Sequence, residues 1–578
     1  MKIPFGAGIF LAAWTVASAA AADLELSIAP QFNGAPLVFD ALVHHTTAGQ
    51  TISITRLDAM LSDIALRRTD GIWIGQRDWL ACLNAREGKT NFILAGIPVG
   101  TYDRLRFHIG LAPQINHGDA ALWPAGHPLN PAVNGLYWGW SREYVFLALE
   151  GHWQDGSKQN GFSYHLATDR ALMTVELPVA LDLTSRRRLQ VVMDIGKIFS
   201  AQRQIELTEA SDTTHSRAND PLALQLKDNV ERAFDSAGEL PSPSPAMVAS
   251  LPRPLIAPDA TPYRLAFSQF FPQPNLPRDN PLTSEGVALG SKLFFDGRLS
   301  ADNSESCATC HRPRRALSQP QRFSRGVDGE IGPRHAMPLE NLAWKNSFFW
   351  DGRAKTLREQ VLQPIQNPIE MHESLTRVVA KVSSDKNYAR LFKNAFGSPE
   401  VTPDHIARAL EQFLLVQVSC DAKFDRVMNG RAKFSEEEQR GFTLFNTEYD
   451  PYHGQFGADC FHCHGGPLFQ SQNFANNGLD AASQDPGRSK VTKRAGDLGK
   501  FAVPSLRNVA LTGPYMHDGR FRTLEEAIEH YCTGVQRSAT LDPNLAKHPD
   551  GGVPLSQADK KALAAFLRTL TDERFAAR

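Results

Sequence analysis

The sequence predicts a multidomain chain in which an N-terminal all-β sandwich is followed by two mainly α units. Three observations support this fold class. Short strand-like segments fill residues 23–235, a stretch with many prolines and almost no charge fills residues 236–264, and capped amphipathic helices begin after residue 265. A chain of 578 residues is also too long for one hydrophobic core, so we expect several domains.

Residues 1–22 have the pattern of a secretory signal peptide. One lysine precedes a short apolar run, and Ala20 and Ala22 have the small-residue spacing of a cleavage site. The run is too short to cross a bilayer and no later stretch is longer, so we expect a periplasmic protein with no membrane span. Lys and Arg total 61 against 62 Asp and Glu, which argues against a nucleic-acid partner.

The strand-like segments are rich in β-branched and aromatic residues, and Gly, Pro, Asn and Asp separate them. Regular short strands of this kind are typical of a β-sandwich. The proline-rich stretch after them should be an extended, semi-rigid linker. The segments are Thr51–Arg56, Thr90–Ile97, Leu105–Ile109, Tyr144–Leu149, Leu172–Leu181 and Leu189–Ile195.

Helix-start signals recur beyond the linker. Thr402 can cap a helix that has Pro403 at its first position. A weak internal repeat places Leu293 and Leu444 at similar distances before two cysteine motifs, so two related units are expected, at 265–425 and 426–578. Capping spacing is found in the pairs Ser435 with Glu438, Thr523 with Glu526, and Ser556 with Asp559.

The two cysteine motifs are the most specific feature of the chain. Cys307-Ala308-Thr309-Cys310-His311 and Cys460-Phe461-His462-Cys463-His464 have the spacing at which two thiols bind one haem covalently and the histidine binds its iron. A redox CxxC pair needs no following histidine. A zinc site built from four distant cysteines would leave both histidines unused. The motifs therefore predict two haem c groups, and covalent haem attachment agrees with export.

Three further cysteines, Cys82, Cys420 and Cys532, lie outside these motifs. An odd number in an oxidising compartment allows one disulfide at most. Cys82 lies in a different domain from the other two, so buried free thiols are the favoured interpretation, with a disulfide as the alternative.

From about residue 265 the chain resembles the bacterial di-haem cytochrome c peroxidase family, and specifically its MauG/MbnH-like branch. The resemblance implies two cytochrome c-like haem domains, the first reactive toward hydrogen peroxide and the second an electron-transfer unit. The motifs that carry it are DNPLTSEGVALGSKLFFDGRLSADNSESCATCH from Asp279, FFWDGR (Phe348–Arg353), LREQVLQPIQNPIEM (Leu357–Met371), CFHCHGG from Cys460, and VPSLRNVALTGPYMHDGRFRTLEEAIEHY (Val503–Tyr531).

The resemblance implies roles for four residues near the first haem. Trp350 matches the tryptophan that relays electrons between the two irons. Gln360, Pro364 and Glu370 match the distal pocket, where Glu370 would move a proton between the peroxide oxygens and Gln360 would orient it. In many peroxidases of this family a distal histidine in the stretch after the first motif fills the sixth site of the first iron. Residues 312–334 contain no histidine. The resemblance to the MauG-like branch therefore implies that the iron at His311 is five-coordinate, high-spin and open to peroxide.

At the second haem the resemblance places Tyr531, 14 residues after His517, as the sixth ligand of the iron held by His464. A phenolate is a hard anionic donor that favours high-valent iron, so the pair predicts storage of oxidising equivalents in a second ferryl-like centre. Met516 is the competing ligand.

The family also binds a calcium ion between the haems. Thr512 and Pro514 match residues of that site, but Arg334 is followed by His335 where the family has asparagine. Imidazole is a poor calcium ligand, so His335 argues against the ion.

The N-terminal region resembles the MbnP family of copper-related β-sandwich proteins. The resemblance implies that a tryptophan is oxidised to kynurenine and that two histidines join it in holding copper. The matching stretches are RLDAMLSDIALRRTDGIW (Arg56–Trp73), PVGTYDRLRFHIGLAPQINHGD (Pro98–Asp119), HPLNPAVNGLYWGWSREYVFLALEG (His127–Gly151) and GFSYHLATD (Gly161–Asp169). The candidate copper ligands are His117 and His165, followed by His45 and His127, and the candidate tryptophans are Trp73, Trp79, Trp138 and Trp140.

The fusion of these two regions gives the first functional hypothesis: an exported di-haem oxidase that uses hydrogen peroxide to oxidise a tryptophan of its attached sandwich and so creates or tunes a copper site. Tethering raises the local concentration of such a substrate. The second hypothesis is a peroxidase that detoxifies peroxide with electrons from a small cytochrome or cupredoxin. The third is a non-catalytic electron carrier joined to a copper-binding module, which would not need an open iron.

Overall fold

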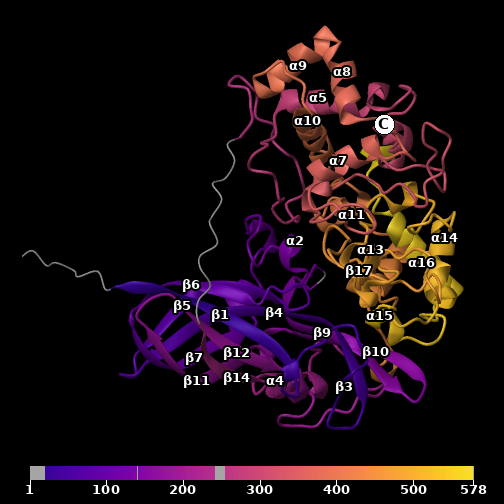
Figure 1. The fold of residues 1–578 in the computed structure, drawn as a ribbon. Helices are drawn as coiled ribbons and strands as arrows, with labels where there is room; N and C mark the ends of the chain where they lie inside the picture. The colour runs from indigo at the N-terminus through magenta and orange to yellow at the C-terminus, as the bar shows by residue number, and fades with distance from the viewer. Residues whose placement is uncertain (1–19, 140, 241–253, 577–578) are drawn as a thin grey trace, which may run out of the picture.

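The computed structural model describes residues 20–139, 141–240 and 254–576. A β-rich N-terminal region lies against a mainly helical C-terminal region (Figure 1), which confirms the fold class expected from the sequence. Most of the expected leader, residues 241–253 of the expected linker, and Trp140 fall outside the described residues. Ala21 and Ala22, at the end of the expected leader, begin the first strand.

Two sheets build the N-terminal region. They share one hydrophobic core, and the regular alternation of buried and exposed positions along one outer strand shows the sandwich arrangement directly. The first sheet has the order β14 (Phe234–Leu240), β12 (Arg187–Asp194), β1 (Ala21–Phe32) and β2 (Ala35–Pro36), with β6 (Asn91–Pro98) also paired to β1. The second has the order β11 (Met173–Leu183), β7 (Gly100–Ile109), β4 (Thr51–Arg68), β9 (Glu143–Asp155), β10 (Lys158–Ala167) and β13 (Thr213–Thr214); β3 (His44–His45) and β5 (Trp73–Asn84) pair with β4, and β8 (Tyr137–Trp138) pairs with β9.

Most neighbouring strands are antiparallel, but β1 with β12 and β10 with β13 run parallel. Each of the six expected segments lies wholly or almost wholly within a strand. The expected boundary at residue 235 falls inside β14, which continues the first sheet as far as Leu240.

The helical region contains two main cores, one for each half of the expected repeat. The predicted caps form: Thr402 accepts a hydrogen bond from the backbone of His405, and Ser435 and Thr523 each take part in a reciprocal capping box. The longer helices are α5 (Ser284–Phe294), α7 (Leu357–Gln366), α8 (Leu375–Ser383), α9 (Lys386–Phe396), α10 (Pro403–Leu415), α11 (Lys423–Met428), α12 (Glu436–Phe445), α14 (Leu524–Glu529) and α16 (Gln557–Arg568).

The internal repeat extends to how the helices pack. In the first unit Gly290 of α5 meets the backbone of Ala409 in α10, and in the second Gly441 of α12 meets the backbone of Ala562 in α16. A Cβ at either glycine would lie within 2.0 Å of the facing carbonyl oxygen, so these helix pairs can approach only with glycine there.

Strands β9 and β10 bring the sandwich against the second helical unit, where the short helix α15 (Pro543–Ala546) lies beside them (Figure 1). The imidazole Nε2 of His152 lies 2.8 Å from the carbonyl oxygen of Leu541, and the guanidinium of Arg86 lies 2.5 Å from the carboxylate of Asp497. Buried polar contacts of this kind show a packed junction between the two halves.

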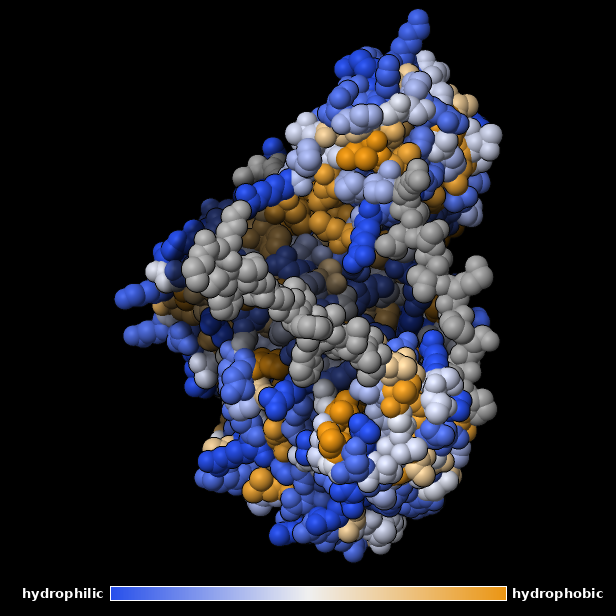
Figure 2. Space-filling view, turned by 90° about the vertical axis from the view of Figure 1, so that its left-hand side faces the viewer, coloured by the Kyte–Doolittle hydropathy of each residue, from blue (hydrophilic) through white to orange (hydrophobic). Residues whose placement is uncertain are grey.

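The outer surface is largely polar. Figure 2 shows hydrophilic side chains over most of one face, with apolar side chains gathered where that face is hollowed. Among the described residues, no helix has both the length and the apolar character needed to cross a bilayer. Among the described residues Cys82, Cys420 and Cys532 form no disulfide; Cys532 is buried and the other two are half-buried.

Candidate haem sites and the junction between the two halves

The first cysteine motif forms a short helix, α6 (Cys307–Cys310), and His311 follows its last turn. The Nδ1 of His311 lies 2.9 Å from the carbonyl oxygen of Leu317, which can only accept, so Nδ1 carries the proton and Nε2 is left for a metal. Burial lowers the pKa of His311 to about 4, which keeps the ring neutral as an iron ligand must be.

A cavity of 1430 Å³ opens beside this motif. Its lining includes both cysteines and His311 together with the three expected distal-pocket residues, Gln360, Pro364 and Glu370. The volume exceeds that of ordinary small-molecule pockets, and the thiols and histidine lie at one wall, so the residues present fit a haem c. The cationic side chains of Lys345, Arg353 and Arg520 also line the cavity and can neutralise haem carboxylates.

Glu370 is the candidate acid/base group of this cavity. Burial raises its pKa, and the side-chain amide of Asn367, which donates a hydrogen bond to Oε1 at 2.8 Å, only partly offsets that effect. A carboxylate with a raised pKa accepts a proton more readily than an ordinary one, as proton transfer from peroxide requires. Gln360 lies on helix α7, and Pro364 lies one turn farther along the same helix.

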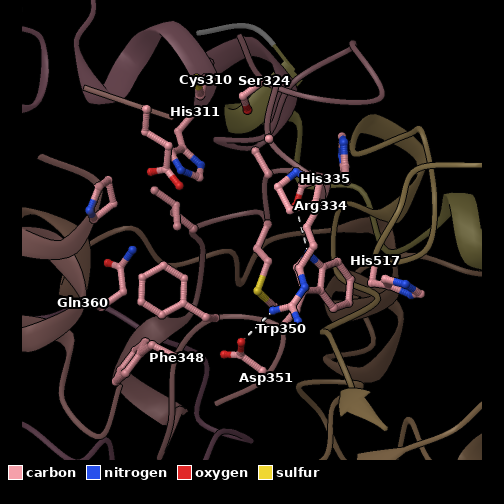
Figure 3. A pocket seen from close by; sticks show the side chains of 18 of the residues that line it. Cys310, His311, Ser324, Arg334, His335, Phe348, Trp350, Asp351, Gln360 and His517 are labelled. Atoms are coloured by element: carbon pink, nitrogen blue, oxygen red, sulfur yellow. Dashed lines mark hydrogen bonds and ion pairs between the residues drawn. The ribbon is translucent and has the colours of Figure 1, made fainter. Parts of the chain in front are cut away.

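Trp350 lies in the same cavity, on the side toward the second unit (Figure 3). Its indole N–H donates a hydrogen bond to the carbonyl oxygen of His335 at 2.8 Å, and its own carbonyl oxygen accepts one from the backbone of Ala502 at 2.8 Å. Figure 3 shows Gln360 and Phe348 on the His311 side and Trp350 beside Arg334 and His335, toward His517. This placement is the one an inter-haem relay needs.

The second motif begins with a 3-10 turn, Cys460–His462, and His464 follows shortly after it. The Nδ1 of His464 lies 3.2 Å from the carbonyl oxygen of Pro504 and 3.3 Å from that of Phe469, so here too Nε2 is left for iron. Burial lowers the pKa of His464 to about 4. These residues also fit a haem c.

Tyr531 and Met516, the two candidate sixth ligands, lie on either side of one amide. The side-chain N–H group of Asn477 lies 3.1 Å from the Tyr531 hydroxyl and 3.3 Å from the Met516 sulfur. Tyr531 lies in a π-helical turn, His530–Gly534, a rare geometry that recurs at functional sites. Burial raises its pKa to about 12, so a phenolate there needs a cation such as iron beside it.

The expected calcium site holds a side chain. The Nδ1 of His335 lies 3.2 Å from the carbonyl oxygens of Gln321 and Arg322, and the ring also bonds the backbone of Thr512. An imidazole therefore lies against the backbone of Thr512, in the segment expected to supply carbonyl oxygens to calcium, and imidazole is a poor calcium ligand. The residues present do not fit calcium.

In the N-terminal region the histidines separate into different environments. His165 is buried and lies with His215 and His462 in one group, in which one ring nitrogen of each histidine lies within 4.8 Å of the others. His117 is half-exposed, with Nε2 2.9 Å from Asp169. His45 contacts the Thr51 hydroxyl at a surface strand, and His127 stacks on Trp123 at 4.4 Å. The structure thus pairs His165 with His215 and places His117 against a carboxylate.

Trp138 lies against this histidine group. Its ring centroid is 5.6 Å from that of His215 and 6.2 Å from that of His165. It lines a small cavity of 90 Å³ together with Phe461, His462 and Cys463 of the second haem motif. Of the other candidates, Trp73 stacks under the guanidinium of Arg106, and Trp79 donates a hydrogen bond to the carbonyl oxygen of Ile93.

Sequence reasoning missed His215 and His462. His462 occupies one of the two variable positions of the haem motif, so the haem assignment hid it. His215 follows two threonines at a strand end with no metal-binding spacing around it. The sequence could have indicated His215 only if the pairing of β10 with β13 were known. That pairing places Tyr164 opposite Thr214 and so brings His165 and His215 together.

Comparison with known proteins agrees with this geometry. The di-haem cytochrome c peroxidase family matches residues 284–433, and the MbnP family matches residues 21–216. The methylamine utilization protein MauG of Methylorubrum extorquens is 38% identical over 301 residues, which cover 51% of this chain and 81% of that protein. Cytochrome c551 peroxidase of Nitrosomonas europaea is 37% identical over 302 residues, with 51% and 82% covered.

Among solved structures, the crystal structure of a MauG-like protein associated with microbial copper homeostasis has a TM-score of 0.48 and 33% identity, covering 54% of this chain and 96% of that one. The cysteine motifs, the cavity with its distal residues and the sequence relatives agree. The chain therefore belongs to the di-haem cytochrome c peroxidase family, in its MauG-like form, and carries an MbnP domain at its N-terminal end.

Proposed function

We propose that this protein is an exported oxidase that uses hydrogen peroxide to convert Trp138 of its own MbnP domain to kynurenine, and that the modified side chain tunes a copper site at His165 and His215. The observation that carries the proposal is the position of Trp138. This side chain and Cys463 of the second haem motif line the same 90 Å³ cavity, so an oxidisable ring of one domain lies beside the haem attachment of the other.

The peroxide site would be the cavity at His311. Haem supplies the iron that accepts peroxide and holds the oxidising equivalents. Glu370 takes a proton from the inner peroxide oxygen and returns it to the outer one, so that water can leave. Gln360, on the same cavity wall, orients the peroxide, and the hydrogen bond from Asn367 holds Glu370 in place.

Trp138 would supply the electrons, and the haems that His311 and His464 would hold would supply the redox chemistry. Trp350 lies between the two units, with its ring fixed by the hydrogen bond to His335 and its backbone fixed by Ala502. Tyr531 supplies an anionic oxygen at the second iron, which stabilises the oxidised state there. Met516 would destabilise that state, because a thioether raises the reduction potential.

The chemistry balances with peroxide as the only oxidant. Two molecules of hydrogen peroxide oxidise the indole to N-formylkynurenine. The side chain gains two oxygen atoms, and two molecules of water are released. Hydrolysis with one water then releases formic acid and leaves kynurenine. The net change in the side chain is the gain of one oxygen and the loss of one carbon.

The test uses the full chain with both haems, purified without peroxide and then treated with it. Peptide mass spectrometry should find the kynurenine change at Trp138 only after treatment. Trp138→Phe should abolish it, while Trp79→Phe, which alters an exposed edge of the sandwich, should leave it unchanged. An unmodified Trp138 after complete consumption of the peroxide would overturn the proposal.

A peroxidase fed by an external donor is the second hypothesis, and the similarity to cytochrome c551 peroxidases favours testing it. If a reduced small cytochrome or cupredoxin is oxidised by peroxide faster than Trp138 is modified, the external donor is the substrate. If the ferric protein does not react with peroxide at all, the non-catalytic carrier remains.

A further inference from the structure

Three histidines from the two halves of the molecule meet at one point of the junction. His165 lies on β10, His215 follows β13, and His462 belongs to the second haem motif. His215 Nε2 lies 2.6 Å from His462 Nε2 and 3.1 Å from His165 Nδ1. All three side chains are almost fully buried. Three imidazole nitrogens that face one another away from water are a costly arrangement unless something binds them.

A carboxylate lies against the other nitrogen of each ring. His165 Nε2 is 2.9 Å from Glu150, His215 Nδ1 is 2.8 Å from Glu448, and His462 Nδ1 is 2.7 Å from Asp459. A carboxylate behind each imidazole is the arrangement that orients metal-binding histidines and makes them stronger donors.

Buried cations hold these carboxylates in turn. Arg56 lies 2.8 Å from Glu150, while Lys547 lies 2.8 Å from Glu448 and 3.2 Å from Asp459. Arg56 and Lys547 therefore offset part of the negative charge of the three carboxylates. The three inner nitrogens stay available for a cation.

We infer that His165, His215 and His462 bind one Cu(I) ion across the domain boundary, so that a residue of the haem-attachment motif completes the copper site of the MbnP domain. The inference deepens the proposed function in that it names the third copper ligand, but it does not require Trp138 to be modified.

The donor set favours Cu(I) over zinc. Imidazole nitrogens suit both metals, but three histidines bind zinc only with a water as fourth ligand, whereas Cu(I) accepts three ligands alone. Aromatic rings occupy the space around the group: Trp138 is 5.6 Å and Phe461 is 5.8 Å from His215 between ring centroids. Cu(I), which needs no fourth ligand, matches three imidazoles that have aromatic rings beside them and a carboxylate on the outer side of each ring.

Room for the ion exists. The 90 Å³ cavity is lined by His165 and His462, and it lies against the ring of Trp138. Metal–nitrogen bonds of about 2.0 Å place ligand nitrogens somewhat more than 3 Å apart, so His215 and His462 need to separate by less than about 1 Å. Rotation of the two rings into the cavity provides that movement.

The site has a built-in spectroscopic reporter. His462 directly precedes Cys463, whose sulfur attaches the second haem, so copper at His462 should perturb the absorption of that haem. A copper ion held by the MbnP domain alone has no such link to the haem.

The test measures Cu(I) binding by the peroxide-free full chain with both haems, under anaerobic conditions and in competition with a coloured Cu(I) chelator. His462→Gln and His215→Gln should each weaken binding by more than about tenfold. His117→Gln, which removes a half-exposed histidine paired with Asp169, is the matched control and should bind as the native chain does. Haem content should be unchanged in all three, because each keeps both CxxCH motifs.

Two results would overturn the inference. Native affinity in His462→Gln would show that the MbnP domain binds copper without the haem half, and tighter binding of Zn(II) than of Cu(I) would show that the metal is wrong. Copper binding is measured before any peroxide treatment. Failure of Trp138 to become kynurenine would therefore count against the proposed function and leave the copper inference unaffected. Asp459→Asn guards against a folding artefact: it keeps the His462 ring and should weaken binding less than His462→Gln does.

Discussion

Gly139 lies directly against Gly466: a Cβ added to Gly139 would come within 2.7 Å of the Gly466 Cα. Gly466 follows the second haem motif, and Gly139 follows Trp138, so this backbone contact sets how near the tryptophan lies to that haem. Any larger residue at 139 must push the two backbones apart.

Gly139→Val should therefore slow the oxidation of Trp138 without affecting the reaction of the haem region with peroxide. We expect both haems and the reaction with peroxide to be retained, while kynurenine formation at Trp138 slows by at least about tenfold, because electron transfer falls steeply with separation and a misplacement of about 1 Å is costly. Single-turnover peroxide kinetics with peptide mass spectrometry would measure both steps. Gly75→Ala is the control, since its added Cβ meets only ordinary contacts at 3.8 Å. Equal rates in the two variants would contradict the role of this contact.

Tyr531→Phe should keep both haems but lose the long-lived oxidised state that peroxide produces. In the proposed function the Tyr531 phenolate would be the anionic donor at the second iron, and phenylalanine would leave no donor there. Stopped-flow absorption and electron paramagnetic resonance would follow the decay of the state. Met516→Leu removes the competing ligand and should leave its lifetime close to that of the native chain. Persistence of the state in Tyr531→Phe, together with its loss in Met516→Leu, would assign methionine as the ligand.

Peroxide reactivity should rise with pH through the pKa of Glu370. The proposed base must be deprotonated to take the peroxide proton, and burial raises its pKa above the ordinary value of 4.5. Below that raised pKa the carboxyl group is protonated and the reaction slows. Glu370→Gln should remove this limb of the pH profile and lower the rate by about 10²–10⁴-fold. An unchanged profile in the variant would assign the limb to another group.

Lys547→Met should destabilise the junction. Lys547 is buried between Glu448 and Asp459, and removing it leaves two buried carboxylates without their shared cation, at a cost of about 3–5 kcal/mol in the free energy of unfolding. Chemical denaturation of the haem-loaded chain would measure it. Lys561, an exposed residue of α16 that pairs with Glu437 of α12, gives the control. Lys561→Met should lower the free energy of unfolding by less than about 1 kcal/mol.

The same cluster predicts acid sensitivity. Burial disfavours the charge on Glu448, but His215 and Lys547 outweigh it and hold the pKa of Glu448 well below its ordinary value. A lowered pKa in the folded state contributes stability above the pKa of the unfolded chain, about 4.3, and that contribution is lost as the pH falls toward the folded value. The free energy of unfolding should therefore drop below about pH 4, and less steeply in Glu448→Gln. Equal slopes would show that other carboxylates dominate.

The features that the sequence predicted are those encoded locally. The two CxxCH motifs and the caps at Thr402, Ser435 and Thr523 depend on residues a few positions apart, and each has the geometry that its spacing implies. The six predicted strand segments, rich in β-branched residues and separated by turn residues, lie wholly or almost wholly in strands of the structure. Of the expected copper ligands, His165 lies in the histidine group and His117 does not belong to it.

The junction could not be predicted in this way. His215 and His462 are 247 residues apart, and their contact depends on how a complete sandwich docks on a complete haem unit. The same docking distinguishes Trp138 from Trp73 and Trp79, because Trp138 lines a cavity together with residues of the second haem motif. Only the tertiary arrangement shows which tryptophan lies beside a haem motif.

Calcium removal gives the last prediction. His335 takes the carbonyl oxygens of Gln321 and Arg322 with its Nδ1, and its backbone carbonyl fixes the Trp350 indole. Because the His335 ring lies against these carbonyl oxygens, we expect a calcium chelator to leave the peroxide reaction and the coupling of the haems unchanged. His335→Asn restores an oxygen donor among these carbonyl oxygens and should make the coupling respond to added calcium, measured by haem redox titration with and without chelator. Loss of coupling in the chelated native chain would show that calcium binds despite His335.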